Sequence, residues 1–285
     1  MQFGVGFPLT ALGDAGEIRD FAQIYEDAGF DYVTVSGHLL SARAGRYDGR
    51  PPVTYVGPYH DPFVLFSYLA ALTSRLRFIT GILILPLLET AAVAKQSAEL
   101  SLLSNNRFEL GVGLSWQEAE YRAVGQDVRR RGVRLAEQIE VLRLYWTRPF
   151  FSFKGKFHDI DELGLNRIPV QPIPIWFGST FSEAPMRRAA RMGDGWMPIP
   201  FADPAEAMPR FKSYVSEVSR DPNAFRFMAR MLAGEGGVDA WIAEGKRLQG
   251  LGITHITLDA PPGMAKPTAV KRVVEAKDAL SKSIG

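Results

Sequence analysis

The chain has 285 residues, of which 46% are hydrophobic and 22% charged, proportions that are ordinary for a folded soluble protein. Its net charge of +2 argues against a general binder of nucleic acid or anionic membranes, and the absence of cysteine excludes disulfides and thiol nucleophiles. The N-terminus lacks the segments of a signal peptide, and the longest apolar run, 79–88, is too short to span a bilayer. We therefore expect a soluble cytoplasmic protein that acts on a small molecule and binds neither nucleic acid nor membrane.

Short β-type runs alternate with helical runs along the whole chain. The first helix is predicted to begin at the capping residue Asp14 and to end at Gly29. Asp61-Pro62 and Asp203-Pro204 predict two further helix starts, because proline fits the first helical position. The strands are expected at residues 3–8, 32–36, 77–84, 108–112, 173–177, 196–199, 225–232 and 253–258.

About eight strands, each followed by a helix, are typical of a closed barrel rather than an open doubly wound sheet. Because no linker or repeat divides the chain, the prediction is a single α/β domain over residues 1–285, a (β/α)8 TIM barrel. Residues 40–60 after the second strand and 150–171 after the fourth are expected to form extended loops. The functional site of such a barrel lies at the carboxyl ends of its strands.

Several glycines follow the predicted strands. Gly178-Ser179 leads from the fifth strand to an amphipathic helix, and the backbone N–H groups at such a helix start favour a phosphate. Gly81 and Gly113 lie at the ends of the third and fourth strands, which suggests that something flat approaches the backbone closely. Together these features favour a planar cofactor that carries a phosphate.

Three other readings are weighed from the residues. A barrel that binds a phosphorylated metabolite as a lyase or isomerase stays open, although its Schiff-base form needs a strand-end lysine, and none is expected. A metal site is not expected because the four histidines, His38, His60, His158 and His255, are scattered along the chain. A binding module without catalysis is the third reading.

An ordered set of short segments resembles the luciferase-like flavin and deazaflavin oxidoreductases, and most of all the branch that uses coenzyme F-420. The segments are 31–38 (DYVTVSGH), 80–86 (TGILILP), 94–96 (AKQ), 111–116 (GVGLSW) with Glu120-Tyr121, 153–157 (FKGKF), 172–178 (PIPIWFG) and 187–196 (RRAARMGDGW). The resemblance implies a homodimeric oxidoreductase that transfers a hydride between F-420 and a small, largely apolar organic substrate. FMN-dependent monooxygenases share these motifs, so an FMN enzyme that uses molecular oxygen is the alternative.

The resemblance also assigns roles to single residues. It implies a non-proline cis peptide bond at Gly81-Ile82, behind the cofactor ring, and His38 as the catalytic residue that faces the ring. The residues expected to contact the cofactor are His38, Gly81, Ile82, Gly113, Ser115, Gly178, Ser179, Thr180 and Ser182. A solvated loop is the preferred reading of the arginines in the first long loop, and the alternative is that Arg43, Arg46 and Arg50 attract the anionic tail of the cofactor. The residues of the same loop placed to close over a substrate are Tyr47, Tyr55, Tyr59 and His60.

Two positions depart from the family pattern. Relatives usually have an aspartate where this chain has Gly37, and its loss removes a carboxylate beside His38. Sugar-phosphate dehydrogenases of the family have a glutamate where this chain has Leu114, so glucose-6-phosphate oxidation is disfavoured and an apolar wall is expected.

The arginine-rich segment after the fourth strand is expected to be solvated. Arginines 129–131 and Arg134 should form an exposed helix face that pairs with Glu137 and Glu140. Glu120 is expected to pair with one of the arginines 129–131.

Overall fold

The computed structural model describes residues 1–7, 14–41, 59–199, 203–234 and 236–285. Its barrel strands are β1 Gln2–Gly6, β2 Tyr32–Gly37, β3 Arg77–Leu83, β4 Phe108–Val112, β7 Ile175–Ser179, β8 Gly195–Pro198, β9 Arg226–Leu232 and β10 His255–Asp259. They pair in parallel and close in the order β1-β10-β9-β8-β7-β4-β3-β2. The predicted (β/α)8 barrel is therefore confirmed.

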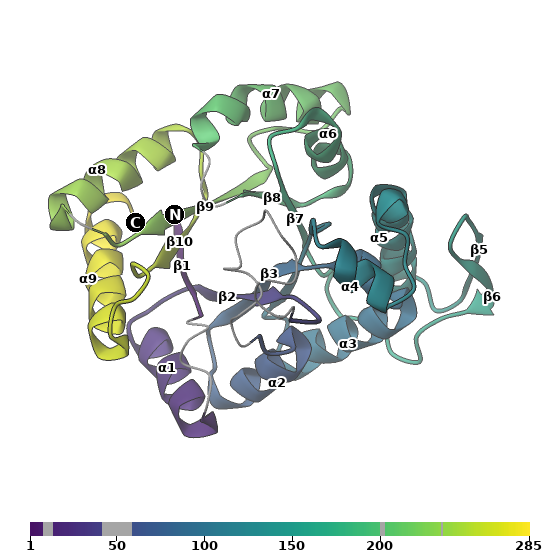
Figure 1. Cartoon of the computed structure of the whole chain (residues 1–285), viewed down its shortest axis with the longest axis horizontal. Helices are drawn as coiled ribbons and strands as arrows, with labels where there is room; N and C mark the ends of the chain where they lie inside the picture. The colour runs from purple at the N-terminus through teal and green to yellow at the C-terminus, as the bar shows by residue number, and fades with distance from the viewer. Residues whose placement is uncertain (8–13, 42–58, 200–202, 235) are drawn as a thin grey trace.

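Helices surround this barrel on all sides (Figure 1). They are α1 Ala15–Asp27, α2 Pro62–Leu72, α3 Thr90–Leu103, α4 Glu118–Ala123, α5 Arg131–Thr147, α6 Glu183–Met192, α7 Pro204–Glu217, α8 Gly237–Gly250 and α9 Lys266–Ile284, with 3-10 turns at Leu85–Leu87 and Val128–Arg130. The three predicted helix caps are confirmed, since Asp14, Asp61 and Asp203 each accept a hydrogen bond of 2.9 Å from a backbone N–H of the following helix. No helix of the described residues is long and apolar enough to cross a membrane.

The strands carry apolar side chains toward the helices, and β4 is buried along its whole length. Aromatic rings join neighbouring layers: Trp196 of β8 stacks on Phe211 of α7, with ring centroids 4.3 Å apart. Trp196 is therefore a packing residue at the barrel wall, fully buried. The two termini lie close together beside β1 and β10, at one edge of the barrel in Figure 1.

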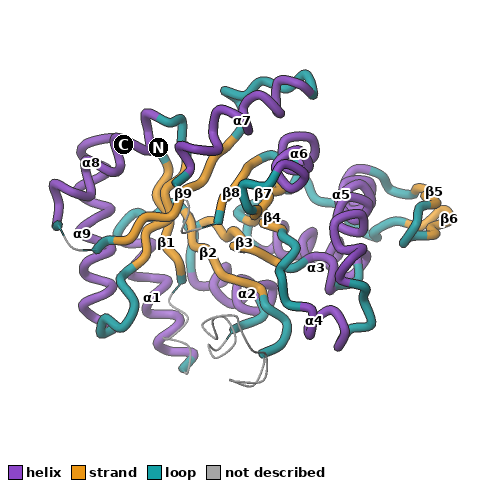
Figure 2. The backbone as a smooth tube through the Cα atoms, turned by 45° about the horizontal axis from the view of Figure 1, so that its top comes forward, coloured by secondary structure: helices purple, strands orange, loops and turns teal. Residues whose placement is uncertain are grey.

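The second long connection, residues 150–171, is not a plain loop. It contains an antiparallel hairpin of β5 Phe151–Lys154 and β6 Asp159–Leu163, which projects outward beyond α5 (Figure 2). Glu137 of α5 holds the hairpin turn by accepting bonds of 2.7 to 2.9 Å from the N–H groups of residues 156–158. The predicted pairing of Glu137 with the preceding arginines is therefore wrong, because the hairpin supplies enough donors to satisfy its carboxylate.

A buried carboxylate ties four barrel strands together. Glu109 of β4, 2% exposed, accepts hydrogen bonds from Arg77 of β3, from the Trp176 indole of β7 at 2.6 Å and from Arg226 of β9 at 2.8 Å. Burial alone opposes ionisation of this carboxyl, but Arg226, Arg77 and Trp176 outweigh it and hold the pKa of Glu109 below its usual value. The carboxylate is therefore stabilised as an ion inside the barrel.

We expect Glu109→Gln to lower the free energy of unfolding by about 3–5 kcal/mol, because two arginines lose their buried counter-charge. Urea unfolding measures the loss, and Glu206→Gln, at an exposed position of α7, is the matched control. Because the pKa is lowered in the folded protein, the difference should be complete above the ordinary pKa of 4.5 and shrink as pH falls through the folded value. A loss that does not depend on pH would contradict this account.

Candidate functional site

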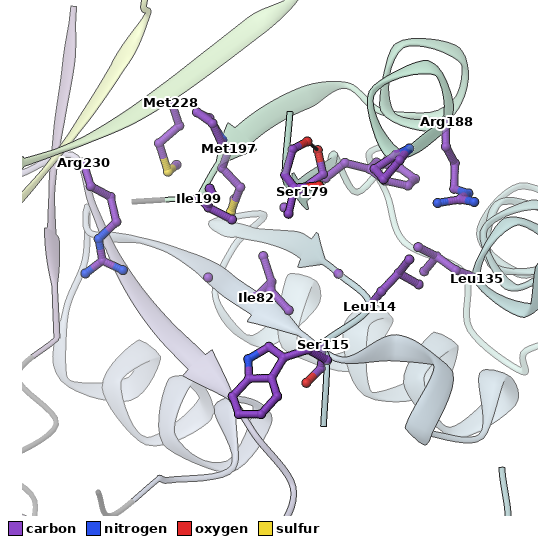
Figure 3. Close-up of a pocket in the computed structure, with 18 of the residues that line it drawn as sticks. Ile82, Leu114, Ser115, Leu135, Ser179, Arg188, Met197, Ile199, Met228 and Arg230 are labelled. Carbon is purple, nitrogen blue, oxygen red and sulfur yellow. Dashed lines mark hydrogen bonds between the residues drawn. The ribbon is translucent and has the colours of Figure 1, made fainter. Parts of the chain in front are cut away.

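One elongated cavity of about 400 Å³ opens at the carboxyl ends of the strands. Its walls come from β3, β7, β8 and β9, from residues 113–116 after β4, from the first two turns of α5 and α6, and from one residue each of β2 and β10. In Figure 3, Arg230 and Arg188 lie at opposite ends of the drawn residues, and Ile82 lies between them. The site therefore has a barrel end near Arg230 and an outer end near Arg188.

The barrel end is mostly apolar. Ile82, Met197 and Met228 line it, and Leu114 continues the apolar wall toward the outer end. The apolar wall expected at Leu114 is thus present in the structure. Arg230 belongs to this end as well, but its charge is already matched by Asp259, whose carboxylate accepts from Nε at 2.7 Å.

The end of β3 departs from regular pairing where it meets the cavity. The predicted cis peptide bond at Gly81-Ile82 is confirmed, and the register of β3 against both neighbours shifts at this point. Side chains replace the missing ladder bonds: the Thr80 hydroxyl accepts from Gly111 N at 2.7 Å, and the Ser36 hydroxyl donates to Gly81 O at 3.1 Å. These two bonds hold the bulge in place, and Ile82 lines the cavity there.

Gly113 and Gly178 make room for the Ile82 side chain. A Cβ at Gly178 would lie 2.5 Å from Ile82 Cγ2, and a Cβ at Gly113 would lie 2.7 Å from Ile82 Cδ1. Both distances are far inside van der Waals contact. At Gly113 and Gly178, the group that approaches the backbone closely is therefore the Ile82 side chain.

The turn after β7 leads into α6 as predicted. Ser182 is the N-cap of α6 but makes no side-chain capping bond, and its hydroxyl instead accepts from Thr180 Oγ1 at 3.2 Å. The Ser179 hydroxyl accepts from the Trp196 indole at 2.8 Å and donates to the Thr180 carbonyl at 3.1 Å. An anion at this turn would therefore meet backbone N–H groups before it met the Ser179 hydroxyl proton.

A carboxylate lies beside His38 even though residue 37 is glycine. Glu120 of α4, 3% exposed, accepts from Leu39 N and Leu40 N at 3.0 and 3.1 Å, and its second oxygen lies 3.0 Å from His38 Nδ1. The predicted pairing of Glu120 with arginines 129–131 is therefore wrong. A carboxylate only accepts hydrogen bonds, so it fixes the His38 proton on Nδ1.

Position 37 itself leaves little room for a side chain. A Cβ on Gly37 would lie 3.0 Å from the Leu83 side chain and 3.1 Å from Pro62, which is tighter than ordinary contact. The carboxylate comes from another element of the fold, and only the tertiary structure reveals it.

Two basic side chains at the outer end were missed by the sequence analysis. Arg131, the first residue of α5, and Arg188 of α6 both line the cavity. Arg134 was expected on the same solvated face but is 8% exposed and donates to Pro86 O at 3.2 Å. Within residues 129–131 and 187–191 several arginines stand close together, and the sequence does not show which of them points into the cavity.

Most of the predicted contact residues meet in this cavity. Those that line it are Gly81, Ile82, Gly113, Ser115, Gly178, Ser179 and Thr180. His38 and Ser182 lie outside its lining, and among the loop residues Tyr59 contacts the His38 ring, with centroids 5.1 Å apart. The loop positions that fall outside the described residues are Arg43, Arg46, Tyr47, Arg50 and Tyr55. The described residues contain no cluster of three His, Asp or Glu side chains placed to hold a metal.

We expect Gly178→Ala to destabilise the protein by about 1–3 kcal/mol, because the new methyl group would overlap Ile82. In the Ile82→Ala background the nearest remaining atom is Ile82 Cβ at 3.5 Å, so the same substitution should cost much less. Urea unfolding of the two single variants and the double variant measures this coupling. Gly250→Ala, which would contact nothing within 4 Å, is the control. Equal losses in both backgrounds would show that Ile82 does not oppose a side chain at position 178.

Known proteins share this architecture. A solved F-420-dependent secondary alcohol dehydrogenase, in complex with an F-420-acetone adduct, superposes with a TM-score of 0.80 at 18% identity and 98% coverage of both chains. An uncharacterised protein of Mycobacterium tuberculosis is 39% identical over 184 residues, which are 62% of each protein. An F-420-dependent hydroxymycolic acid dehydrogenase of the same species is 30% identical over 217 residues, 74% of this chain and 57% of that protein.

These matches span less than two thirds of the curated relatives' own lengths. The family model described as luciferase-like monooxygenase matches residues 1–233, which is most of the chain. The chain belongs to the luciferase-like monooxygenase family.

Proposed function

We propose that this protein is an oxidoreductase that transfers a hydride between coenzyme F-420 and a small, largely apolar organic substrate. The observation that carries the proposal is the cavity itself, whose apolar barrel end leads past a helix-start turn to a cationic outer end. A flat ring with a phosphate-bearing chain matches that order of surfaces. Two relatives named for F-420-dependent dehydrogenation support the choice of cofactor.

The residues present fit such a cofactor. Ile82 would support the ring from one face, while Met197 and Met228 supply soft apolar contacts that adapt to its shape. The backbone at Gly178-Ser179 leads to α6, whose N-cap side chain leaves the first N–H groups of the helix to a ligand. The bound cofactor would supply the hydride chemistry, and the protein would supply binding, orientation and exclusion of water.

We assign His38 the proton transfer that accompanies hydride transfer. Glu120 holds its Nδ1 at 3.0 Å, so the proton exchanged with the substrate would pass through Nε2. The two backbone bonds from residues 39 and 40 fix Glu120 in turn. Glu120 thus takes the place of the aspartate that relatives carry before the histidine, as a positioning residue for His38. Leu114, in place of a glutamate, keeps the adjoining wall apolar and favours a substrate without a sugar phosphate.

Parallel titrations with F-420 and FMN test the proposal. We expect the protein to bind F-420 with a micromolar Kd and FMN more weakly, followed by fluorescence and by the absorption spectrum of the bound cofactor. Turnover with nitro compounds, enones and alcohols then identifies the substrate class. Binding of FMN with no response to F-420 would overturn the proposal and favour the alternative, an FMN-dependent monooxygenase. Tight F-420 binding without any turnover would favour a binding module.

We expect His38→Ala to lower kcat by about 100- to 10,000-fold while the Kd of F-420 changes little, because proton transfer is lost and the cavity wall is kept. Glu120→Gln should lower kcat by less, since an amide whose oxygen keeps the two backbone bonds still holds the ring but donates its NH2 to Nδ1 and so favours the opposite tautomer. Glu118→Gln, two residues earlier at an exposed position of α4, is the control. An unchanged kcat in His38→Ala would remove His38 from the mechanism.

A further inference from the structure

The outer end of the cavity brings two guanidinium groups together. Arg188 lies against the first turn of α5, where a Cβ on Gly132 would come within 2.7 Å of Arg188 Nη2. Arg131, the residue before that glycine, lines the same cavity. The absence of a side chain at Gly132 therefore allows Arg188 to reach the start of α5.

Neither guanidinium has an acidic partner among the residues that the structure describes. Within the described residues Arg188 makes no hydrogen bond or ion pair, whereas its neighbour Arg187 pairs with both Glu183 and Glu217. Arg131 donates to the Val128 carbonyl at 2.6 Å, and its buried Nε has no hydrogen-bond partner in the described part of the chain. Burial, together with the positive charges of Arg191 and Arg131, lowers the pKa of Arg188.

The start of α5 adds to this positive charge. The helix has 17 residues, no acidic side chain in its first turn and no side-chain capping bond at its N-cap. Its first N–H groups carry the positive end of the helix dipole. Half-buried like charges that face one another without a counter-ion destabilise a protein unless a ligand neutralises them.

We propose that Arg188 and Arg131, at the start of α5, form an anion subsite that binds a carboxylate or phosphate group of a ligand lying in the cavity. A guanidinium presents two parallel N–H groups that match either anion. The anion belongs either to the chain of the cofactor or to an acidic substrate. The inference rests on the proposed function only in taking this cavity as the ligand site, and its main test needs no cofactor.

The test is binding of inorganic phosphate to the purified protein at constant ionic strength, measured by calorimetry and by the shift in Tm. We expect the wild type to bind phosphate and Arg188→Gln to bind it at least about tenfold more weakly. Arg191→Gln, which removes an exposed charge one turn away on the same helix, should bind as the wild type does. Arg188→Lys should restore part of the affinity, and Arg131→Gln is a second, independent variant.

If Arg188 instead stabilised the fold, its loss would lower the Tm of the protein without phosphate. Because Arg188 makes no bond within the described residues, Arg188→Gln should leave Tm unchanged or raise it. A lower Tm together with unchanged phosphate affinity would overturn the proposal. Equal phosphate affinity in the Arg188→Gln and Arg191→Gln proteins would also overturn it.

Two cofactor forms distinguish the sources of the anion. If the cofactor chain occupies the subsite, Arg188→Gln will weaken F-420 at least about tenfold but leave the deazaflavin riboside, which lacks phosphate and glutamates, unaffected. If an acidic substrate occupies it, both cofactor forms will bind Arg188→Gln normally, and phosphate will still bind the F-420 complex of the wild type. If phosphate binds through Arg188 but neither F-420 nor FMN binds, the subsite stands and the proposed function fails.

Discussion

The Glu109 carboxylate inside the barrel holds together the frame on which the cavity is built. Its partners come from β3, β7 and β9, so one buried group joins strands that are not all neighbours in the sheet. The Arg226 guanidinium also lies over the Trp176 ring, 4.6 Å from its centroid. An ion in this position is stable only if all of its partners are in place. The amino ends of β3, β4 and β9, opposite the strand ends that carry the cavity, are thereby held together.

On this frame the cavity is shaped by close approaches between strand ends. Ile82 lies at the bulge of β3 and fills the space beside Gly113, which follows β4, and Gly178 of β7. The apolar barrel end of the cavity is therefore built around the side chain of Ile82. The arginines at the outer end are placed by the helices, so the two ends of the cavity differ in charge because different layers of the barrel build them.

The carboxylate beside His38 comes from a distant part of the chain and not from the preceding residue. Leu83 and Pro62 crowd residue 37, so any side chain there would have to displace them slightly. The carboxylate of Glu120 reaches the same histidine from α4, across a sequence separation of 82 residues. Chemistry that depends on a carboxylate beside His38 is thus compatible with this chain.

Hydrophobic periodicity and the Asp-Pro helix starts determined the alternation of strands and helices, because these signals act within a few residues along the chain. The glycines and serines at strand ends likewise located one part of the cavity lining, around β3, β7 and the segment after β4, since every strand of a parallel barrel ends on the same face. The partner of Glu120, the inward turn of Arg188 rather than Arg191, and the hairpin within residues 150–171 were decided only by the tertiary structure. Each of these features depends on contacts with an element far away in the sequence. A local pattern cannot predict such contacts, and it cannot distinguish two arginines on the same helix.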